Sequence, residues 1–124
     1  MIQLNYRDTK PIYEQIKDGL RRLVISHAIT PDEKLPSVRE MASSLTINPN
    51  TIQRAYRELE NEGYVYTIAG KGTFAATHET VAEGRMDELL HEFDDIVIEL
   101  LYMSVDPDTL NRRMIKLNEG GAMK

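Results

Sequence analysis

Residues 35–74 read LPSVREMASSLTINPNTIQRAYRELENEGYVYTIAGKGTF, and this stretch decides the fold. Ser37 precedes Glu40 by three residues, a spacing typical of the capping box that starts a helix. Asn48 and Pro49 form a second start signal, because asparagine caps helices well and proline needs no N–H at the first helical position. The sequence therefore predicts two helices separated by a tight turn.

The second of these helices is expected to be amphipathic and to end at Gly63, a good left-handed cap. Its apolar residues follow the spacing i, i+3, i+4, i+7: Ile52, Ala55, Tyr56 and Leu59. The polar residues that this spacing turns outward are Asn50, Gln53, Arg54 and Arg57. One face should be buried and the other should be accessible to a partner.

Beyond Gly63, two segments rich in β-branched and aromatic residues flank a turn bracketed by Gly70 and Gly72. Residues 64–68 read YVYTI and residues 73–75 read TFA, the expected composition of a β-hairpin with Lys71 at its tip. Two helices followed by such a hairpin predict a winged helix-turn-helix. Upstream, residues 11–26 have apolar residues at helical spacing, whereas residues 28–36 contain two prolines and predict an ordered connector.

Residues 80–102 predict one long helix whose apolar residues repeat at alternating steps of four and three. A shorter helix should follow from Asp108 to about Leu117, after the stop at Asp106-Pro107. The shorter helix could cover part of the apolar stripe, but it has too few apolar residues to cover all of it, so a second copy of the chain is the expected partner. The residues predicted at that dimer interface are Met86, Leu89, Leu90, Phe93, Ile96, Val97, Leu100 and Leu101.

The predicted fold class is α+β, with a winged helix-turn-helix domain over residues 1–76 and a short all-α dimerisation domain over residues 77–124. The net charge of −5 is distributed unevenly. Residues 1–76 contain 10 Lys and Arg against 9 Asp and Glu, whereas residues 77–124 contain 5 against 11. The acidic part lowers non-specific affinity for polyanions, but a local positive surface can still contact phosphates.

The sequence gives little support to enzymatic, metal-dependent or membrane functions. There is no cysteine, and His91 with Asp95 supplies at most two metal ligands, so neither a metal nor a cofactor is expected. No nucleophile elbow or phosphate loop is present. The chain begins without a leader pattern and has no run of about 18 apolar residues, which predicts a soluble, cytoplasmic protein without a membrane partner.

Asn50, Gln53 and Arg54 have the chemistry that reads base edges in the major groove, where arginine pairs with guanine, and asparagine or glutamine with adenine. The alternative for such a polar stripe is a solvated helix face. A second alternative is a winged helix that binds proteins. Salt separates the two binding functions, because contacts to phosphates weaken steeply with salt and an apolar protein interface does not.

Four motifs occur in order: KLPSVRE at 34–40, NPNTIQRAY at 48–56, LENEG at 59–63 and GKGTF at 70–74. In these motifs the chain resembles the GntR family of bacterial transcription regulators over about residues 10–76. The NPNT start and a C-terminal part of only about 48 residues are similar to the YtrA-like branch. The resemblance implies a winged helix-turn-helix that binds double-stranded operator DNA, and a short helical dimerisation unit.

The resemblance also implies which residues contact DNA: Ser37, Arg39, Asn48, Asn50, Thr51, Gln53, Arg54, Gly70, Lys71 and Gly72. The glycines and lysine of this set would enter the minor groove. Many family members have Arg where this chain has Pro49, and Gly where it has Asp32. One expected base or phosphate contact is therefore missing.

The function implied by the resemblance is that of a homodimeric repressor. Its twofold symmetry would match a palindromic operator with half-sites about 10 bp apart, or a multiple of that distance. Transporter genes are the targets that similar YtrA-like proteins suggest. A regulator gated by a small-molecule effector is the alternative, and its site would lie at the dimer interface among Phe93, Tyr102 and Met103.

Overall fold

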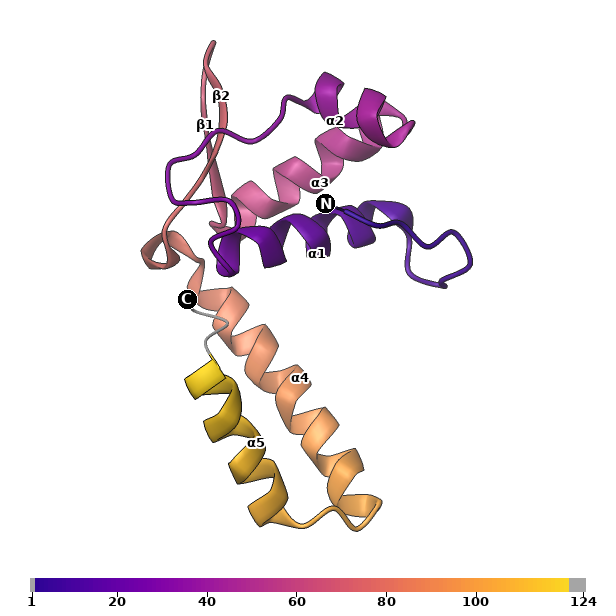
Figure 1. Ribbon diagram of the computed structural model, residues 1–124, viewed down its shortest axis with the longest axis vertical. Coiled ribbons are helices and arrows are strands. Elements are labelled where there is room, and N and C mark those ends of the chain that lie inside the picture. Colours follow the sequence, from indigo (N-terminus) through magenta and orange to yellow (C-terminus); the bar gives the residue numbers. More distant parts are fainter. Residues whose placement is uncertain (1, 121–124) are drawn as a thin grey trace. The chain divides into compact units, whose positions relative to one another are not determined.

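The computed structural model describes residues 2–120, apart from the side chain of Glu83. Within this range the helices and strands follow one another as an α+β fold, which confirms the predicted class (Figure 1). Their bounds are α1 Ile12–Ile25, α2 Val38–Leu45, α3 Pro49–Glu62, β1 Val65–Ile68, β2 Gly72–Ala75, the 3₁₀ helix η1 His78–Thr80, α4 Glu83–Tyr102 and α5 Pro107–Gly120. The chain divides into two compact units, Met1–Val81 and Ala82–Lys124.

The two helix starts that the sequence predicts are present. The amide of Glu40 donates to the Ser37 hydroxyl at 3.0 Å, and the Glu40 carboxylate accepts from the Ser37 amide at 2.8 Å. This capping box lowers the pKa of Glu40, chiefly because the carboxylate accepts the backbone hydrogen bond from Ser37. At the start of α3, the Asn48 side chain accepts from the amide of Asn50 at 2.8 Å. Local sequence thus fixes where the two helices begin.

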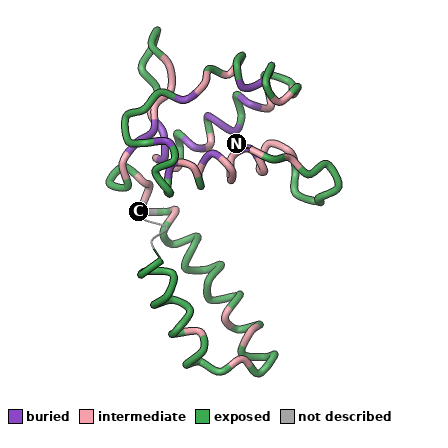
Figure 2. The backbone as a smooth tube through the Cα atoms, in the orientation of Figure 1, coloured by how far each residue is buried: buried purple, intermediate pink, exposed green. Residues whose placement is uncertain are grey.

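Helix α3 is the central element of the first unit and lies between α1 and α2 (Figure 1). Its four predicted apolar residues are all buried: Ile52, Ala55, Tyr56 and Leu59. The other buried residues come mainly from α1, α2 and β1 (Figure 2), and include Ile16, Leu20, Val24, Met41, Ala42 and Val65. One face of α3 is thereby covered, and the opposite face is left exposed.

The wing is an antiparallel hairpin whose register runs from Val65 opposite Ala75 to Ile68 opposite Gly72. The connector before α2 pairs with the outer side of this hairpin, because the Leu35 amide donates to the Thr73 carbonyl at 2.8 Å. A backbone bridge joins Lys34 to Phe74. The sequence predicted an ordered connector but not this pairing. The connector contains two prolines and has no alternation of apolar and polar residues, so nothing in its sequence indicates that its backbone pairs with a strand.

The first unit extends to Val81, five residues beyond the boundary expected after Ala76. The Thr80 hydroxyl donates to the Gly63 carbonyl at 2.8 Å, and Val81 packs against the core of the first unit. These contacts hold residues 77–81 against the C-terminal end of α3. For the same reason α4 begins at Glu83, and not at Thr80 as the spacing had suggested.

The second unit contains α4 and α5, joined by a short turn in which Ser104 adopts a left-handed φ of 67°. The Val105 amide donates to the Leu100 carbonyl at 3.0 Å, which closes the end of α4. No described side chain between Ala82 and Gly120 is buried (Figure 2). No helix within residues 2–120 is long and apolar enough to cross a membrane. Residues 121–124 of the predicted second domain lie outside the described residues.

We expect Gly63→Ala to lower the free energy of unfolding by more than about 2 kcal/mol, because the residue has a φ of +86° and a Cβ there would lie 1.8 Å from the Thr80 carbonyl oxygen. Gly70→Ala is the matched control, since Gly70 has a φ of +78° but open space around it. It should cost only about 1 kcal/mol. Urea denaturation of the two variants measures both, and equal losses would contradict the predicted clash.

Candidate nucleic-acid interface

The exposed face of α3 carries three of the residues predicted to contact DNA. Asn50, Gln53 and Arg54 are all exposed, whereas Thr51 is half-buried. Asn50, Thr51 and Arg54 line a shallow hollow that α1 completes with Ile12 and Tyr13. Helix α3 therefore presents amide and hydroxyl groups near its first turn, next to the beginning of α1.

Arg54 has protein partners in addition to solvent. Its guanidinium lies over the ring of Tyr13 at 3.7 Å from the centroid, within cation–π distance. Its Nε also donates to the Glu58 carboxylate at 3.2 Å, one turn along α3. The side chain remains 55% exposed, so a phosphate could still reach it. These contacts give Arg54 a role in joining α1 to α3 that the sequence interpretation did not foresee.

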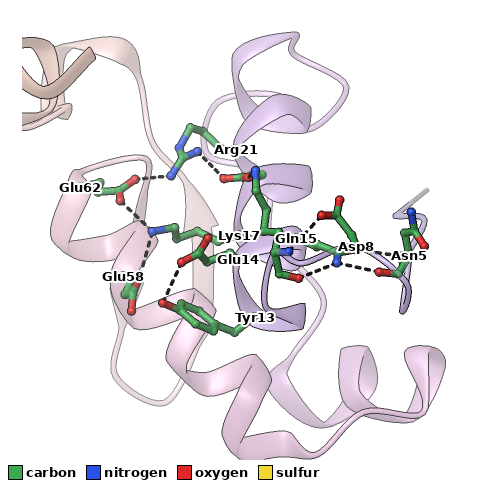
Figure 3. Close-up of polar contacts among 11 residues, drawn as sticks. Asn5, Asp8, Tyr13, Glu14, Gln15, Lys17, Arg21, Glu58 and Glu62 are labelled. Atoms are coloured by element: carbon green, nitrogen blue, oxygen red, sulfur yellow. Dashed lines mark hydrogen bonds and ion pairs between the residues drawn. The ribbon is translucent and has the colours of Figure 1, made fainter. Parts of the chain in front are cut away.

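Glu58 belongs to a network of ion pairs between α1 and α3 (Figure 3). Lys17 pairs with Glu58 at 2.8 Å and with Glu62 at 3.3 Å. Arg21 pairs with Glu62 at 2.8 Å and lies 5.4 Å from the centroid of the Tyr64 ring. Two of the cations of the first unit are thus used within the protein and do not form part of the candidate interface.

Lys10 and Arg54 are also paired, with Asp18 and Glu58, but several other cations of the first unit form no ion pair within residues 2–120. Arg39 is among them, exposed on the first turn of α2. Lys71 is exposed at the tip of the wing, and Arg57 is exposed on α3. A cation without an internal partner keeps its full charge available for a phosphate or a base. These side chains therefore define the positive part of the candidate interface.

The wing tip is a turn that needs its glycines. The Lys71 amide donates to the Ile68 carbonyl at 2.9 Å, and Gly70 and Gly72 have φ values of +78° and +126°. The Lys34 side chain passes close to Gly72, where an added Cβ would lie 2.7 Å from the Lys34 Cε. The fold thus brings Lys34 to the wing near Lys71, which the sequence interpretation missed because the residues are distant in sequence. The only sequence signal for this proximity was that Lys34 and Lys71 are both basic.

The structure places the remaining predicted residues at the two helix starts. Ser37 and Asn48 act as caps, and both are exposed. Arg39 lies beside the turn between α2 and α3 and shares a surface hollow with Pro49. The predicted residues therefore fall into three groups: those around the α2–α3 turn, those on α3 beside α1, and those at the wing tip.

Two capped helices, the second with one exposed face, followed by a glycine-tipped hairpin, form a winged helix-turn-helix, a fold typical of DNA-binding proteins. Residues 12–75 match the family described as bacterial regulatory proteins, gntR family. The chain belongs to this family, as its motifs had predicted.

The similarity to one relative extends into the second unit. The HTH-type transcriptional repressor YtrA of Bacillus subtilis (strain 168) is 38% identical over 113 residues, which cover 90% of this chain and 87% of the repressor. This similarity agrees with the predicted YtrA-like subfamily. The relatives are transcriptional regulators, so the protein is a regulator and not an enzyme.

Two solved structures extend the comparison. A transcriptional antiterminator from Listeria monocytogenes EGD-e is 29% identical with a TM-score of 0.83, covering 100% of this chain and 93% of that one. The DNA-binding domain of AraR in complex with operator ORR3 is 30% identical with a TM-score of 0.54, covering 60% of this chain and 89% of that one. The second similarity is to a protein bound to operator DNA.

We expect Glu58→Gln to reduce stability by less than about 1 kcal/mol near neutral pH, and to have no effect in acid. The hydrogen bond from Lys17, with a smaller contribution from Arg54, lowers the pKa of Glu58 below its ordinary value of 4.5. A lowered folded-state pKa means that the carboxylate stabilises the fold above about pH 4.5, and that this contribution is lost as the pH falls through the folded-state pKa.

Urea denaturation at several pH values between about 3 and 7 measures this difference. Glu60→Gln is the control, because Glu60 is exposed on the same helix and forms no ion pair within the described residues. A loss at Glu58 that is the same at every pH would show that the ion pair is not its cause.

Proposed function

We propose that this regulator is a homodimeric repressor that binds an inverted-repeat operator through two copies of its winged helix-turn-helix. The observation that carries the proposal is the combination of unpaired cations and base-reading side chains on the exposed surface of α2, α3 and the wing. YtrA of Bacillus subtilis, which is similar over most of its length, is a repressor, and this supports repression over activation.

Helix α2 supplies an anchor for the phosphate backbone in this proposal. The amides of Val38 and Arg39, at its first turn, have no hydrogen-bond partner within residues 2–120, whereas those of Glu40 and Met41 are bonded to Ser37. Free amides at a helix N-terminus favour an anion, and the Arg39 guanidinium adds a full charge beside them. A phosphate can therefore bind the start of α2 while Arg39 reaches toward a base.

Helix α3 would read bases with Asn50 and Gln53, whose exposed carboxamides can pair bidentately with adenine. The wing would place Lys71 in the adjacent minor groove, with Lys34 close to the same hairpin. Arg54 would contribute less to base recognition than the sequence suggested, since Tyr13 and Glu58 already hold its guanidinium.

The second unit supports the dimer through its exposed apolar surface. A helix pair without a buried side chain among its described residues has no core of its own. Six of the eight residues predicted at the dimer interface have exposed side chains, from 41% for Leu89 to 65% for Met86. The six are Met86, Leu89, Leu90, Phe93, Ile96 and Leu101. A second copy presenting the same stripe would cover them, and its twofold axis would match an inverted repeat.

The experiment that tests the function is selection of bound duplexes from a random DNA library at moderate salt, followed by sequencing. We expect an enriched inverted repeat with half-sites about one helical turn apart, or a multiple of that distance. Its neighbourhood in the genome would identify the target genes, for which the resemblance suggests transporters. A single asymmetric site would contradict the twofold complex, and no enrichment would contradict sequence-specific binding by the chain alone.

Arg39→Ala should then weaken binding to the selected operator by about 1–3 kcal/mol without loss of fold. Arg22→Ala is the matched control, because Arg22 is an exposed cation of α1 that forms no ion pair within the described residues and lies outside the proposed interface. Fluorescence anisotropy with labelled operator compares the two variants. Equal affinities for both would remove Arg39 from the interface.

For the dimer, Phe93→Glu should convert the protein to a monomer, because a carboxylate cannot be buried in an apolar interface without a large desolvation cost. Ile98→Glu is the control: Ile98 is 65% exposed on the same helix but lies away from the predicted stripe. Sedimentation should give about twice the 14.2 kDa chain mass for the wild type and for Ile98→Glu. A wild-type mass of one chain would refute the dimer.

A further inference from the structure

We propose that Pro49, together with Ile47, forms an apolar contact for the methyl group of one operator thymine, beside the base that Arg39 reaches. The inference rests on the proposed DNA-binding function and adds to it a base preference at one position. It concerns the surface between α2 and the first turn of α3, where Arg39, a predicted DNA contact, lines one hollow together with Ile47 and Pro49.

The hollow lies on the surface between α2 and the start of α3. Its walls come from one stripe of α2, from the turn, and from the first residue of α3: Arg39, Ala42, Ser43, Thr46, Ile47 and Pro49. Ile47 is half-buried against the core, whereas Pro49 and Arg39 are exposed. Ala42, Ile47 and Pro49 give the hollow an apolar surface, Ser43 and Thr46 add two hydroxyl groups, and Arg39 is the one cation that lines it. This combination fits a ligand in which an electronegative group lies next to a small apolar group.

The start of α3 can contribute only apolar contact at this point. Pro49 has no N–H, the Asn50 amide already donates to the Asn48 side chain at 2.8 Å, and the Thr51 amide donates to the Asn48 carbonyl at 3.0 Å. A phosphate would therefore find no free backbone donor on the first turn of α3, in contrast to the first turn of α2. What Pro49 offers to DNA is the carbon surface of its ring.

In the major groove, one base feature matches such a surface. Thymine carries a C5 methyl group, whereas the other base edges present hydrogen-bond donors and acceptors. Arg39 at the edge of the same hollow suits the acceptors of a guanine. Because Pro49 has neither a charge nor a hydrogen-bond donor, its preferred partner is a methyl group and not an acceptor.

The test uses the full chain and the operator obtained by selection. Each thymine of one half-site is replaced in turn by deoxyuridine, which removes only the methyl group, and the dissociation constant is measured at constant salt. We expect one thymine at which the replacement weakens binding about 3- to 5-fold, the effect of one buried methyl group. The remaining thymines are internal controls.

Pro49→Ala assigns the effect to this residue. In this variant the Asn48 cap is retained, and the difference between thymine and deoxyuridine at the sensitive position should disappear. Pro31→Ala, at an exposed proline of the connector, should leave the difference intact. If Pro49→Ala loses its helical circular dichroism, Ile47→Val, which removes one methylene from the same surface, should reduce the difference instead.

Two outcomes would overturn the inference: no thymine that responds to deoxyuridine, or a response of equal size in the wild type and in Pro49→Ala. Either result would leave sequence-specific operator binding in place, because that binding is established by the selection itself. Conversely, a selection without enrichment would reject the proposed function before any thymine is tested.

Discussion

Burial of one face of α3 is the constraint on which the candidate interface depends. Ile52, Ala55 and Leu59 have no exposed surface, so the rotation of the helix about its axis is fixed. A shift of one residue would turn every side chain by about 100° and bring charged groups into the core. The orientation of Asn50 and Gln53 toward solvent thus follows from packing, and is not a separate property of the polar residues.

Both ends of α3 are also held. Asn48 caps its first turn, and Gly63 closes its last turn in a left-handed conformation that residues 77–81 then contact. Because residues 77–81, which lead to the second unit, contact the C-terminal end of α3, Gly63 has two functions. It allows the helix to end, and it leaves room for the close approach of the Thr80 carbonyl oxygen. A side chain at this position would interfere with both.

The charges of the first unit divide into two groups that net charge cannot distinguish. Lys17 and Arg21 have side chains that are only 15% and 11% exposed, and they are paired with carboxylates of α3. Arg39 and Lys71 have no such partners within residues 2–120. The first unit is nearly neutral, yet it can still present a positive surface. Its carboxylates are paired mainly with cations that are half-buried between α1 and α3, and not with the exposed cations Arg39 and Lys71. The surface charge therefore depends more on where the ion pairs lie than on how many there are.

Sequence reasoning succeeded where the signals are local. The capping box at Ser37, the cap at Asn48 and the turn at Gly70 each depend on residues at most three positions apart, so they could be predicted directly. It was incomplete where the partner is distant. The pairing of Lys17 with Glu58 joins residues 41 positions apart. The ring of Tyr13 that holds Arg54, and the hairpin that pairs with the connector, are likewise supplied by tertiary structure.

The second unit presents the opposite case, because both of its helices were predicted from local signals, apart from the start of α4, although neither buries a described side chain. Helix α4 has 20 residues, and its described side chains include none that is buried. Helices in water gain most of their stability from packing an apolar face. An unpaired stripe from Met86 to Leu101 therefore favours association. In the proposed dimer, the interaction that gives these helices a core also links two winged helix-turn-helix units, so that one complex carries two copies of the candidate interface.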